Sequence, residues 1–287
     1  MLSLLVFGHV AGPIVPSAIA VAIAGRWFLL VGLGLMVGAS FVATVVYPAP
    51  RRSLLLLSAA AWLASVVGLG IVVLTLVGTD LDVPLWRVAV LRSAPLLVAG
   101  IAILAERGAA QPTTRGMATI GIAAAAAMLA DVGTTHLSHA AEAHPAHVEV
   151  FVHWLHVVGV GTWVGGLAAL LVSLPREGGA AVATVVRRFS ASAGIGIGIV
   201  SVTGLMRAVQ ELGPLDNLLT TDFGRLLVAK SVLLVALAAL GAGQRLVSVP
   251  AASRWLGPLR RIGGTELAVG AVVLLLASAL VNVPPPG

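Results

Sequence analysis

The sequence predicts an all-α membrane protein, a polytopic bundle of about eight transmembrane helices. Three observations predict this class: 59% of the 287 residues are hydrophobic, only 10% are charged, and the mean hydropathy is +1.07. An ordinary soluble chain has roughly 45–50% apolar and about 25% charged residues. No soluble fold has an interior large enough for this apolar surface, so lipid must solvate most of the chain.

Eight apolar runs are long enough to cross about 30 Å of hydrocarbon as helices. They are expected at residues 27–47, 54–77, 85–105, 116–138, 151–174, 190–212, 223–246 and 262–281. The runs lack the alternation of apolar and polar residues that is typical of transmembrane strands. Their many glycines and alanines are expected to let the helices pack closely in lipid.

Positive charge is confined to alternate loops between these runs. The loops of one set carry Arg51, Arg52, Arg107, Arg115, Arg176, Arg187, Arg188, Arg245, Arg254, Arg260 and Arg261, with only Glu106 and Glu177 against them. The positive-inside rule places this set in the cytoplasm. The net charge of +6 therefore indicates orientation in a membrane, and we expect no binding to nucleic acid.

In the leading segment 1–26, residues 2–24 are apolar, but they contain two prolines and no Lys or Arg precedes them. A secretory signal would begin with positive charge. We expect this segment to lie on the outer membrane surface, with a ninth span as the alternative. The remaining chain is expected to divide into N-terminal helices at 27–115 and a second helical region at 116–287.

Six of the seven histidines fall within residues 136–156, and the chain has no cysteine. They are His136 and His139 at the end of one expected helix, His144 and His147 in a short loop, and His153 and His156 at the start of the next helix. Residues three apart share one face of a helix. A short loop joins antiparallel neighbours, so the two helical pairs can face each other at the outer membrane face. Converging imidazoles are typical of a copper or zinc site.

Three interpretations of this cluster stay open. The histidines can be polar residues of a wet interface, or ligands of haem, or ligands of a metal ion. Haem needs one histidine from each of two helices and a wide gap between them, which the paired spacing does not specifically favour. Hydrolytic zinc is disfavoured because the glutamate of an HExxH helix is missing. His9, the remaining histidine, can join the site only if the leading segment folds over the outer surface.

The second half of the chain carries a series of short motifs. They are HWLHVVGVGTWVGGL from His153 to Leu167, Arg188-Phe189-Ser190, Val202-Thr203-Gly204, TTDFGRLLVAK from Thr220 to Lys230, Glu266, and Asn282-Val283-Pro284-Pro285. In this order they resemble the copper resistance protein D (CopD) family over roughly residues 116–286. The first half resembles that family only in its looser pattern.

The resemblance implies a prokaryotic inner-membrane protein that moves copper from the periplasmic side toward the cytoplasm and is not an enzyme. It implies His139, His153 and His156 as copper ligands, and a periplasmic CopC-like copper-binding protein as a partner. His136 is added on spacing alone, and His144 and His147 are candidates for handing ions to the deeper pairs. Three further residues are expected to pack helices just below the site: Trp163, Gly165 and Gly166. The alternative is a di-haem or quinone-linked electron-transfer protein that uses the same histidines.

Ionisable residues at membrane depth are costly and are therefore functional candidates. Asp131 lies about a turn and a half below the first histidine pair, and Lys230 lies about 10 Å into its helix, where it could pair with Asp131. Glu266 lies about one turn from the cytoplasmic end of the last helix. It either pairs with Arg260 or Arg261, or forms with Asp131 a polar step for a descending cation or a counter-moving proton.

Overall fold

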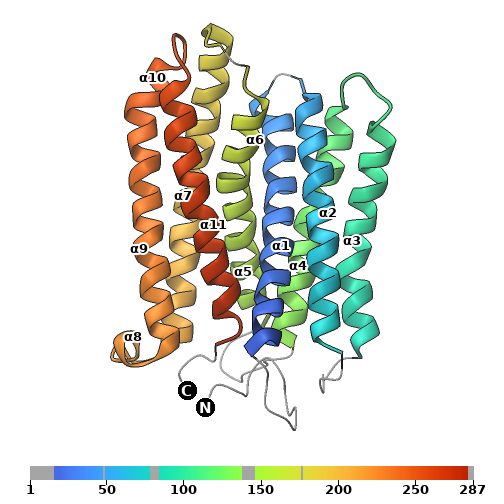
Figure 1. Cartoon of the computed structure of the whole chain (residues 1–287), viewed down its shortest axis with the longest axis vertical. Coiled ribbons are helices and arrows are strands. Elements are labelled where there is room, and N and C mark those ends of the chain that lie inside the picture. The colour runs from blue at the N-terminus through green and yellow to red at the C-terminus, as the bar shows by residue number, and fades with distance from the viewer. Residues whose placement is uncertain (1–15, 48, 78–83, 138–145, 176, 284–287) are drawn as a thin grey trace.

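The computed structural model describes residues 16–47, 49–77, 84–137, 146–175 and 177–283, and these residues form helices and short connections without a strand. Eight of the described helical segments are long and apolar enough to cross a membrane. Figure 1 shows them side by side as an elongated bundle. The predicted fold class, an all-α bundle of about eight spans, is therefore confirmed.

The elements follow one another along the chain in a simple order, in which η marks a π-helical turn. They are α1 (Pro16–Phe41), η1 (Val42–Val46), α2 (Arg52–Thr75), α3 (Leu85–Glu106), α4 (Thr114–Leu137), α5 (Ala146–Val160), η2 (Gly161–Gly165), α6 (Gly166–Ser173), α7 (Ala180–Leu212), α8 (Asn217–Thr220), α9 (Asp222–Gly243), η3 (Gln244–Ser248), α10 (Val249–Ala251) and α11 (Gly257–Leu280). The π-helical turns continue their neighbours, so that α1–η1, α5–η2–α6 and α9–η3–α10 are each one continuous rod.

Two helices start about ten residues earlier than the apolar runs indicated. α1 begins at Pro16, so residues 16–26 form its first turns, and residues 1–15 lie outside the described part of the chain. α7 begins at Ala180 and has 33 residues, a length of about 50 Å at 1.5 Å per residue. This exceeds the roughly 30 Å of hydrocarbon. Arg187 and Arg188 therefore lie inside a helix that continues beyond its apolar stretch, and hydropathy alone cannot detect such an extension.

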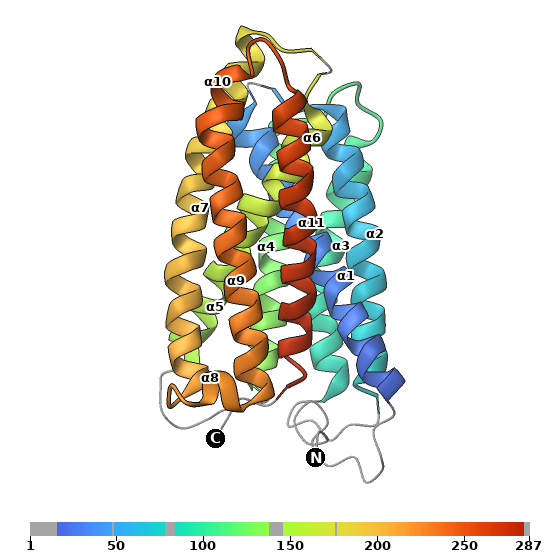
Figure 2. The same cartoon turned by 60° about the vertical axis from the view of Figure 1, so that its left-hand side comes forward.

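The two ends of the bundle differ in charge. The connections η1–α2, α3–α4, α6–α7 and α10–α11 lie at one end, and α8 lies at the other (Figures 1 and 2). The first set of connections carries arginines such as Arg51, Arg107 and Arg254, and we call this end the basic end. The other end holds α8 and the start of α5 with His147, and we call it the histidine end.

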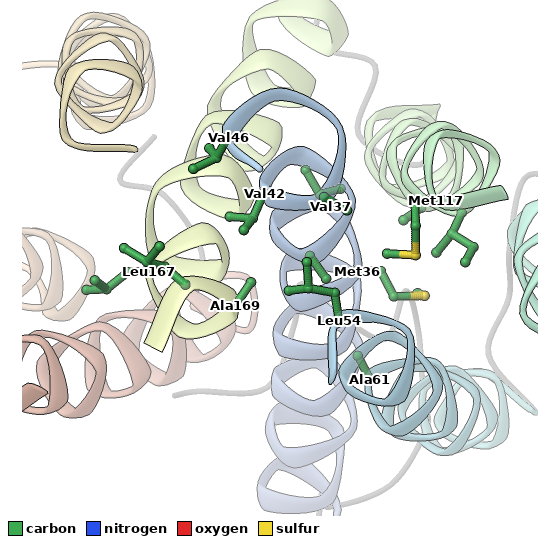
Figure 3. Packing of buried hydrophobic residues seen from close by; sticks show 14 of the residues in the cluster. Met36, Val37, Val42, Val46, Leu54, Ala61, Met117, Leu167 and Ala169 are labelled. Atoms are coloured by element: carbon green, nitrogen blue, oxygen red, sulfur yellow. The ribbon is translucent and has the colours of Figure 1, made fainter. Parts of the chain in front are cut away.

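α1 is the central helix of the bundle, and α9 is peripheral. Within the most apolar stretch of each span, 61% of residues are buried in the first and only 6% in the seventh, which includes α9. The main core packs around α1 and includes Met36, Leu54, Met117 and Leu167 (Figure 3). The span of α1 is therefore the most closely packed one, whereas α9 lies at the surface of the bundle.

The contact between α1 and η2 is made by glycines on both sides. Gly34 and Gly38 on α1 meet Gly161 and Gly165 in η2, and both pairs have the spacing of a GxxxG motif. A Cβ atom at Gly38 would overlap the backbone of Gly165, and one at Gly165 would overlap the backbone of Gly34. Only glycine permits this approach, which joins the second half of the bundle to the central helix.

Three tryptophan side chains link pairs of helices by hydrogen bonds. Each indole Nε1 donates to a backbone carbonyl of another helix: Trp27 to Ala271 (3.0 Å), Trp62 to Leu96 (2.7 Å) and Trp154 to Ala125 (2.8 Å). These bonds satisfy indole donors that would otherwise lie unpaired in an apolar environment. The bond from Trp154 fixes the rotation of α5 against α4 and thereby orients the histidines of α5.

Candidate functional site

His156 on α5 contacts α7. Its Nδ1 atom lies 3.0 Å from Oγ1 of Thr203. A Cβ atom at Gly204 would lie only 3.1 Å from Cε1 of His156, so the glycine leaves room for the ring. The Val202-Thr203-Gly204 motif of α7 therefore forms the wall against which His156 packs.

The hydrogen bonds of Thr203 determine which ring nitrogen of His156 is free. Oγ1 of Thr203 donates its single proton to the carbonyl oxygen of Ile199, at 2.6 Å. The hydroxyl can then only accept from His156, so Nδ1 carries the hydrogen and Nε2 keeps its lone pair. A metal-binding imidazole is oriented by such a bond on its other nitrogen. His156 is thus prepared to offer Nε2 to a ligand.

The structure describes some of the other predicted histidine ligands and not others. His153 is half-buried one turn before His156, and His147 is exposed in the first turn of α5. His136 lies in the last turn of α4, next to α5 at the histidine end, and its side chain is outside the described part. His139 and His144 lie in 138–145, which the structure does not describe. Among the side chains that are described, no three metal-binding residues gather, so convergence of the histidines stays a prediction.

Asp131 is held by two arginines and not by Lys230, so the suggested pairing with Lys230 is wrong. The carboxylate lies 3.3 Å from Nη2 of Arg26 and 3.2 Å from Nη1 of Arg92. All three side chains are largely buried, with exposed fractions of 4% for Asp131, 12% for Arg26 and 6% for Arg92. The group joins α1, α3 and α4 through opposite charges in a water-poor environment.

Two threonines of α4 complete this cluster. Nε of Arg92 donates to Oγ1 of Thr134 at 2.8 Å, and Nη2 of Arg92 and of Arg26 lie 3.3 and 3.4 Å from Oγ1 of Thr135. Neither Arg26 nor Arg92 was among the candidate residues of the sequence analysis. The missed signal was the coincidence of arginines and a buried aspartate at similar depth in three neighbouring helices.

Lys230 lies in a second charged group, between α7 and α9. Its charge interacts with Arg207 and Glu211, and Arg207 forms an ion pair with Glu211 one turn along α7. Lys230 and Arg207 also act electrostatically on His156. Any cation at His156 would therefore meet two positive side chains, and Glu211 is the carboxylate that offsets them.

Glu266 on α11 is buried, with 3% exposed, and does not pair with the neighbouring arginines as one interpretation suggested. Its Oε1 accepts a hydrogen bond of 2.7 Å from Nε2 of Gln244. Arg260 instead donates to the carbonyls of Leu174 and Pro175, at 3.3 and 2.8 Å, and Arg261 is exposed. Gln244 begins the π-helical turn η3 and was not singled out from the sequence.

The residues predicted to lie below the histidines form an apolar layer. Trp163 is buried against Val200 of α7 and Leu237 of α9. Gly165 meets α1, and a Cβ atom at Gly166 would lie 2.9 Å from Cε2 of Phe189 on α7. Since η2 lies between α1 and α7, these small residues let both helices approach it.

These features define a polytopic helical membrane protein whose second half carries polar groups at two depths. Residues 183–280 match the family described as CopD, Copper resistance protein D. The chain is 32% identical over 152 residues to the Copper transport protein CutJ of Bacillus subtilis (strain 168). The resemblance to the CopD family noted in the sequence is thus confirmed, and the family model matches it over residues 183–280.

The comparisons cover only part of each chain. The similarity to the Bacillus protein spans 52% of this chain and 28% of that protein, so this chain covers less than a third of that protein's length. The family match includes Thr203, Lys230 and Glu266, whereas His153 and His156 precede it. No solved structure matches the chain.

Proposed function

We propose that this protein binds copper at the histidine end of the bundle and moves it across the membrane toward the basic end. The observation that carries the proposal is the bond between His156 and Thr203, which leaves Nε2 of the imidazole free. The match of residues 183–280 to the CopD family and the similarity to a protein named as a copper transport protein support copper as the ion. The role is transport, and no catalytic step is part of it.

The proposed orientation follows from the charged connections. The arginine-rich basic end would face the cytoplasm of a prokaryotic cell under the positive-inside rule, and the histidine end would face the periplasm or cell exterior. Copper would then be taken up from the outer side, where a CopC-like periplasmic protein could deliver it. The membrane is accordingly the inner membrane.

The proposed ligands are imidazoles because the chain contains no cysteine. His139, His153 and His156 form the proposed ligand set, His136 is a fourth candidate, and His144 and His147 would receive the ion. Neutral imidazole suits copper well. Release toward the membrane interior requires either protonation of an imidazole or a change in the distance between α4 and α5.

The three ionisable residues inside the membrane spans differ in how well their surroundings suit a pathway for copper. A cation approaching Asp131 would meet Arg26 and Arg92, so we assign Asp131 to holding helices together. Lys230 lies close enough to His156 for an electrostatic effect and would raise the free energy of a bound cation. Glu266 lies on the basic side of the apolar layer around Trp163 and is the carboxyl best placed to follow the histidines.

Removal of both histidines of α5 tests the site. The double variant His153→Ala/His156→Ala should remain folded and lose its stoichiometric copper, measured by mass spectrometry of the purified protein. His9→Ala, which removes the histidine outside the cluster, should retain the metal. Unchanged copper content in the double variant would contradict the assignment.

Two further measurements separate this function from its alternatives. Uptake of copper into proteoliposomes should depend on the same two histidines, whereas a chaperone or sensor would bind copper without moving it. The visible spectrum of the purified protein should lack a Soret band. A strong Soret band that disappears in the double variant would instead assign the histidines to haem and electron transfer.

A further inference from the structure

A cavity lies in the half of the bundle that faces the basic end. It has a volume of about 230 Å³ and is lined by residues of η2–α6, α7, α9–η3–α10 and α11. Its lining extends from Trp163 to Val249 and Leu259, which flank the connection between α9 and α11 at the basic end. The cavity therefore reaches from the apolar layer around Trp163 toward the proposed cytoplasmic side.

The wall of this cavity is mostly apolar and contains few polar side chains. They are Ser190, Gln244, Arg245 and Glu266. Glu266 is the single carboxyl among them. Its Oε1 accepts from Gln244, and no hydrogen bond to its Oε2 is formed by the described residues. One carboxyl oxygen is thus fixed by the amide, and the second is available inside the cavity.

An apolar layer separates this carboxyl from the histidines. Trp163, Val200 and Leu237 pack together and are 2–3% exposed. Trp163 follows His156 by seven residues along α5–η2, about 10 Å at 1.5 Å per residue. The bundle half formed by α5 to α11 therefore has an imidazole group on one side of an apolar layer and a carboxyl group on the other.

The chemistry of the two groups differs. Imidazole nitrogens suit copper, whereas carboxyl, amide and hydroxyl oxygens suit protons and hard cations. An ionised carboxylate buried without a cation is costly. Arg245 is the charged residue that faces the cavity from η3, and the surroundings on α6 and α7 are Leu167, Phe189 and Ser190. On α11 itself, Arg260 is engaged by backbone carbonyls and Arg261 is exposed.

We propose that Glu266 is a proton-binding site, oriented by Gln244 in the basic-end cavity, and that its proton is exchanged for copper during transport. The proposal rests on the proposed copper transport. One carboxylate compensates one positive charge, either that of its own proton or that of a Cu⁺ ion passing through the cavity, so the presence of one excludes the other. The carboxylate supplies this negative charge and is not itself a copper ligand. When copper reaches the cavity, the O–H bond of the carboxyl breaks and the proton leaves; when copper leaves, the carboxylate binds a proton again. Competition for one site makes the two ions move in opposite directions.

Proteoliposomes that contain a pH-sensitive dye test the exchange. Copper uptake by the wild-type protein should be accompanied by proton efflux. Glu266→Gln should retain copper at the histidine end, lose the proton efflux, and reduce copper uptake at least tenfold. Glu266→Asp should restore part of both fluxes. The matched control is Glu177→Gln, which removes an exposed carboxyl at the basic end and should leave both fluxes unchanged.

Infrared spectroscopy gives a second readout that does not depend on copper transport. The wild-type protein without copper should show a C=O stretching band of a protonated carboxyl that is absent in Glu266→Gln and present in Glu177→Gln. Failure of the wild-type protein to take up copper would contradict the proposed function, while the infrared band would still decide whether Glu266 binds a proton. Copper uptake without proton movement, or proton efflux that persists in Glu266→Gln, would overturn the exchange.

Discussion

Asp131 and Glu266 are both buried carboxyls, with 2% and 3% of each residue exposed, yet their surroundings are opposite. Asp131 has a guanidinium group on each side within 3.3 Å. Glu266 has one amide at 2.7 Å and a cavity beside it. Burial alone makes either residue a functional candidate, and the neighbouring charges decide between them. The first is a link between helices, and the second is the carboxyl at which we propose cation exchange.

The same contrast holds for the helices that carry these residues. Asp131 connects α4 to α1, the most buried span, whereas Glu266 shares its cavity with α9, which belongs to the least buried one. The CopD match covers residues 183–280 and hence α7 to α11. The family match thus lies in the three least buried spans, the sixth to the eighth, and the five spans before them are more buried.

The largest effect is expected at the ion-pair cluster. Asp131→Asn leaves Arg26 and Arg92 buried without a carboxylate, and removal of one partner from a buried ion pair costs about 3–5 kcal/mol. The free energy of unfolding, measured by circular dichroism during titration with a denaturing detergent, should fall by about this amount.

The matched control for Asp131 is an exposed ion pair. Asp222 lies 3.6 Å from Arg225, and their side chains are 67% and 63% exposed. Such pairs contribute about 0–1 kcal/mol, so Asp222→Asn should unfold close to the wild-type transition. Equal losses in the two variants would show that Asp131 is no more structural than a surface residue.

A smaller loss of stability is expected at the glycine contact between the halves. In Gly38→Ala the new methyl group would overlap the backbone of η2, and overpacking of this kind costs about 1–3 kcal/mol. In Gly70→Ala the methyl group meets no atom within 4 Å, and replacement of a helical glycine should have no cost. The same unfolding titration compares them, and similar midpoints would contradict a backbone contact between α1 and η2.

The smallest effect concerns the orientation of His156. Thr203→Val removes the hydroxyl that accepts from Nδ1, and loss of such a supporting bond typically weakens metal binding 10–100-fold. Copper affinity, measured by competition with a chelator, should fall about tenfold while the fold is kept. Thr162→Val removes a hydroxyl that bonds only to the carbonyl of Val158, and it should bind copper as the wild type does. A Thr203→Val protein of unchanged affinity would exclude His156 as an oriented ligand.

Much of the fold follows from the composition and from the positions of the charged residues. The number of apolar runs long enough to cross a membrane gives the number of spans, and the basic loops between the runs indicate where spans end. The first residues of α1 and α7 were predicted about ten positions too late, because charged residues were taken to mark the ends of these helices. A charged residue does not end a helix when it pairs inside the bundle, as Arg26 does with Asp131, or when the helix continues out of the hydrocarbon, as at Arg187 in α7.

The candidate site was less accessible from the sequence, because depth in the membrane does not give the rotation of a helix. Asp131 and Lys230 were both recognised as deep charges, but they face different neighbours on α3 and α7. Gln244 and Thr203 are uncharged. The high cost of burying a charge in a membrane span, which singles out ionisable residues in a sequence, therefore did not identify them. Their roles depend on contacts between helices that are distant in the chain. The ligand role of the histidines remains a prediction.

The three indole bonds described above have a practical consequence. An indole N–H neither titrates nor carries a formal charge, so these links between helices do not change with pH, salt or metal content. Three of the six tryptophans therefore hold pairs of helices together in the same way whether or not an ion is bound. Protonation of the histidines would leave these three links in place.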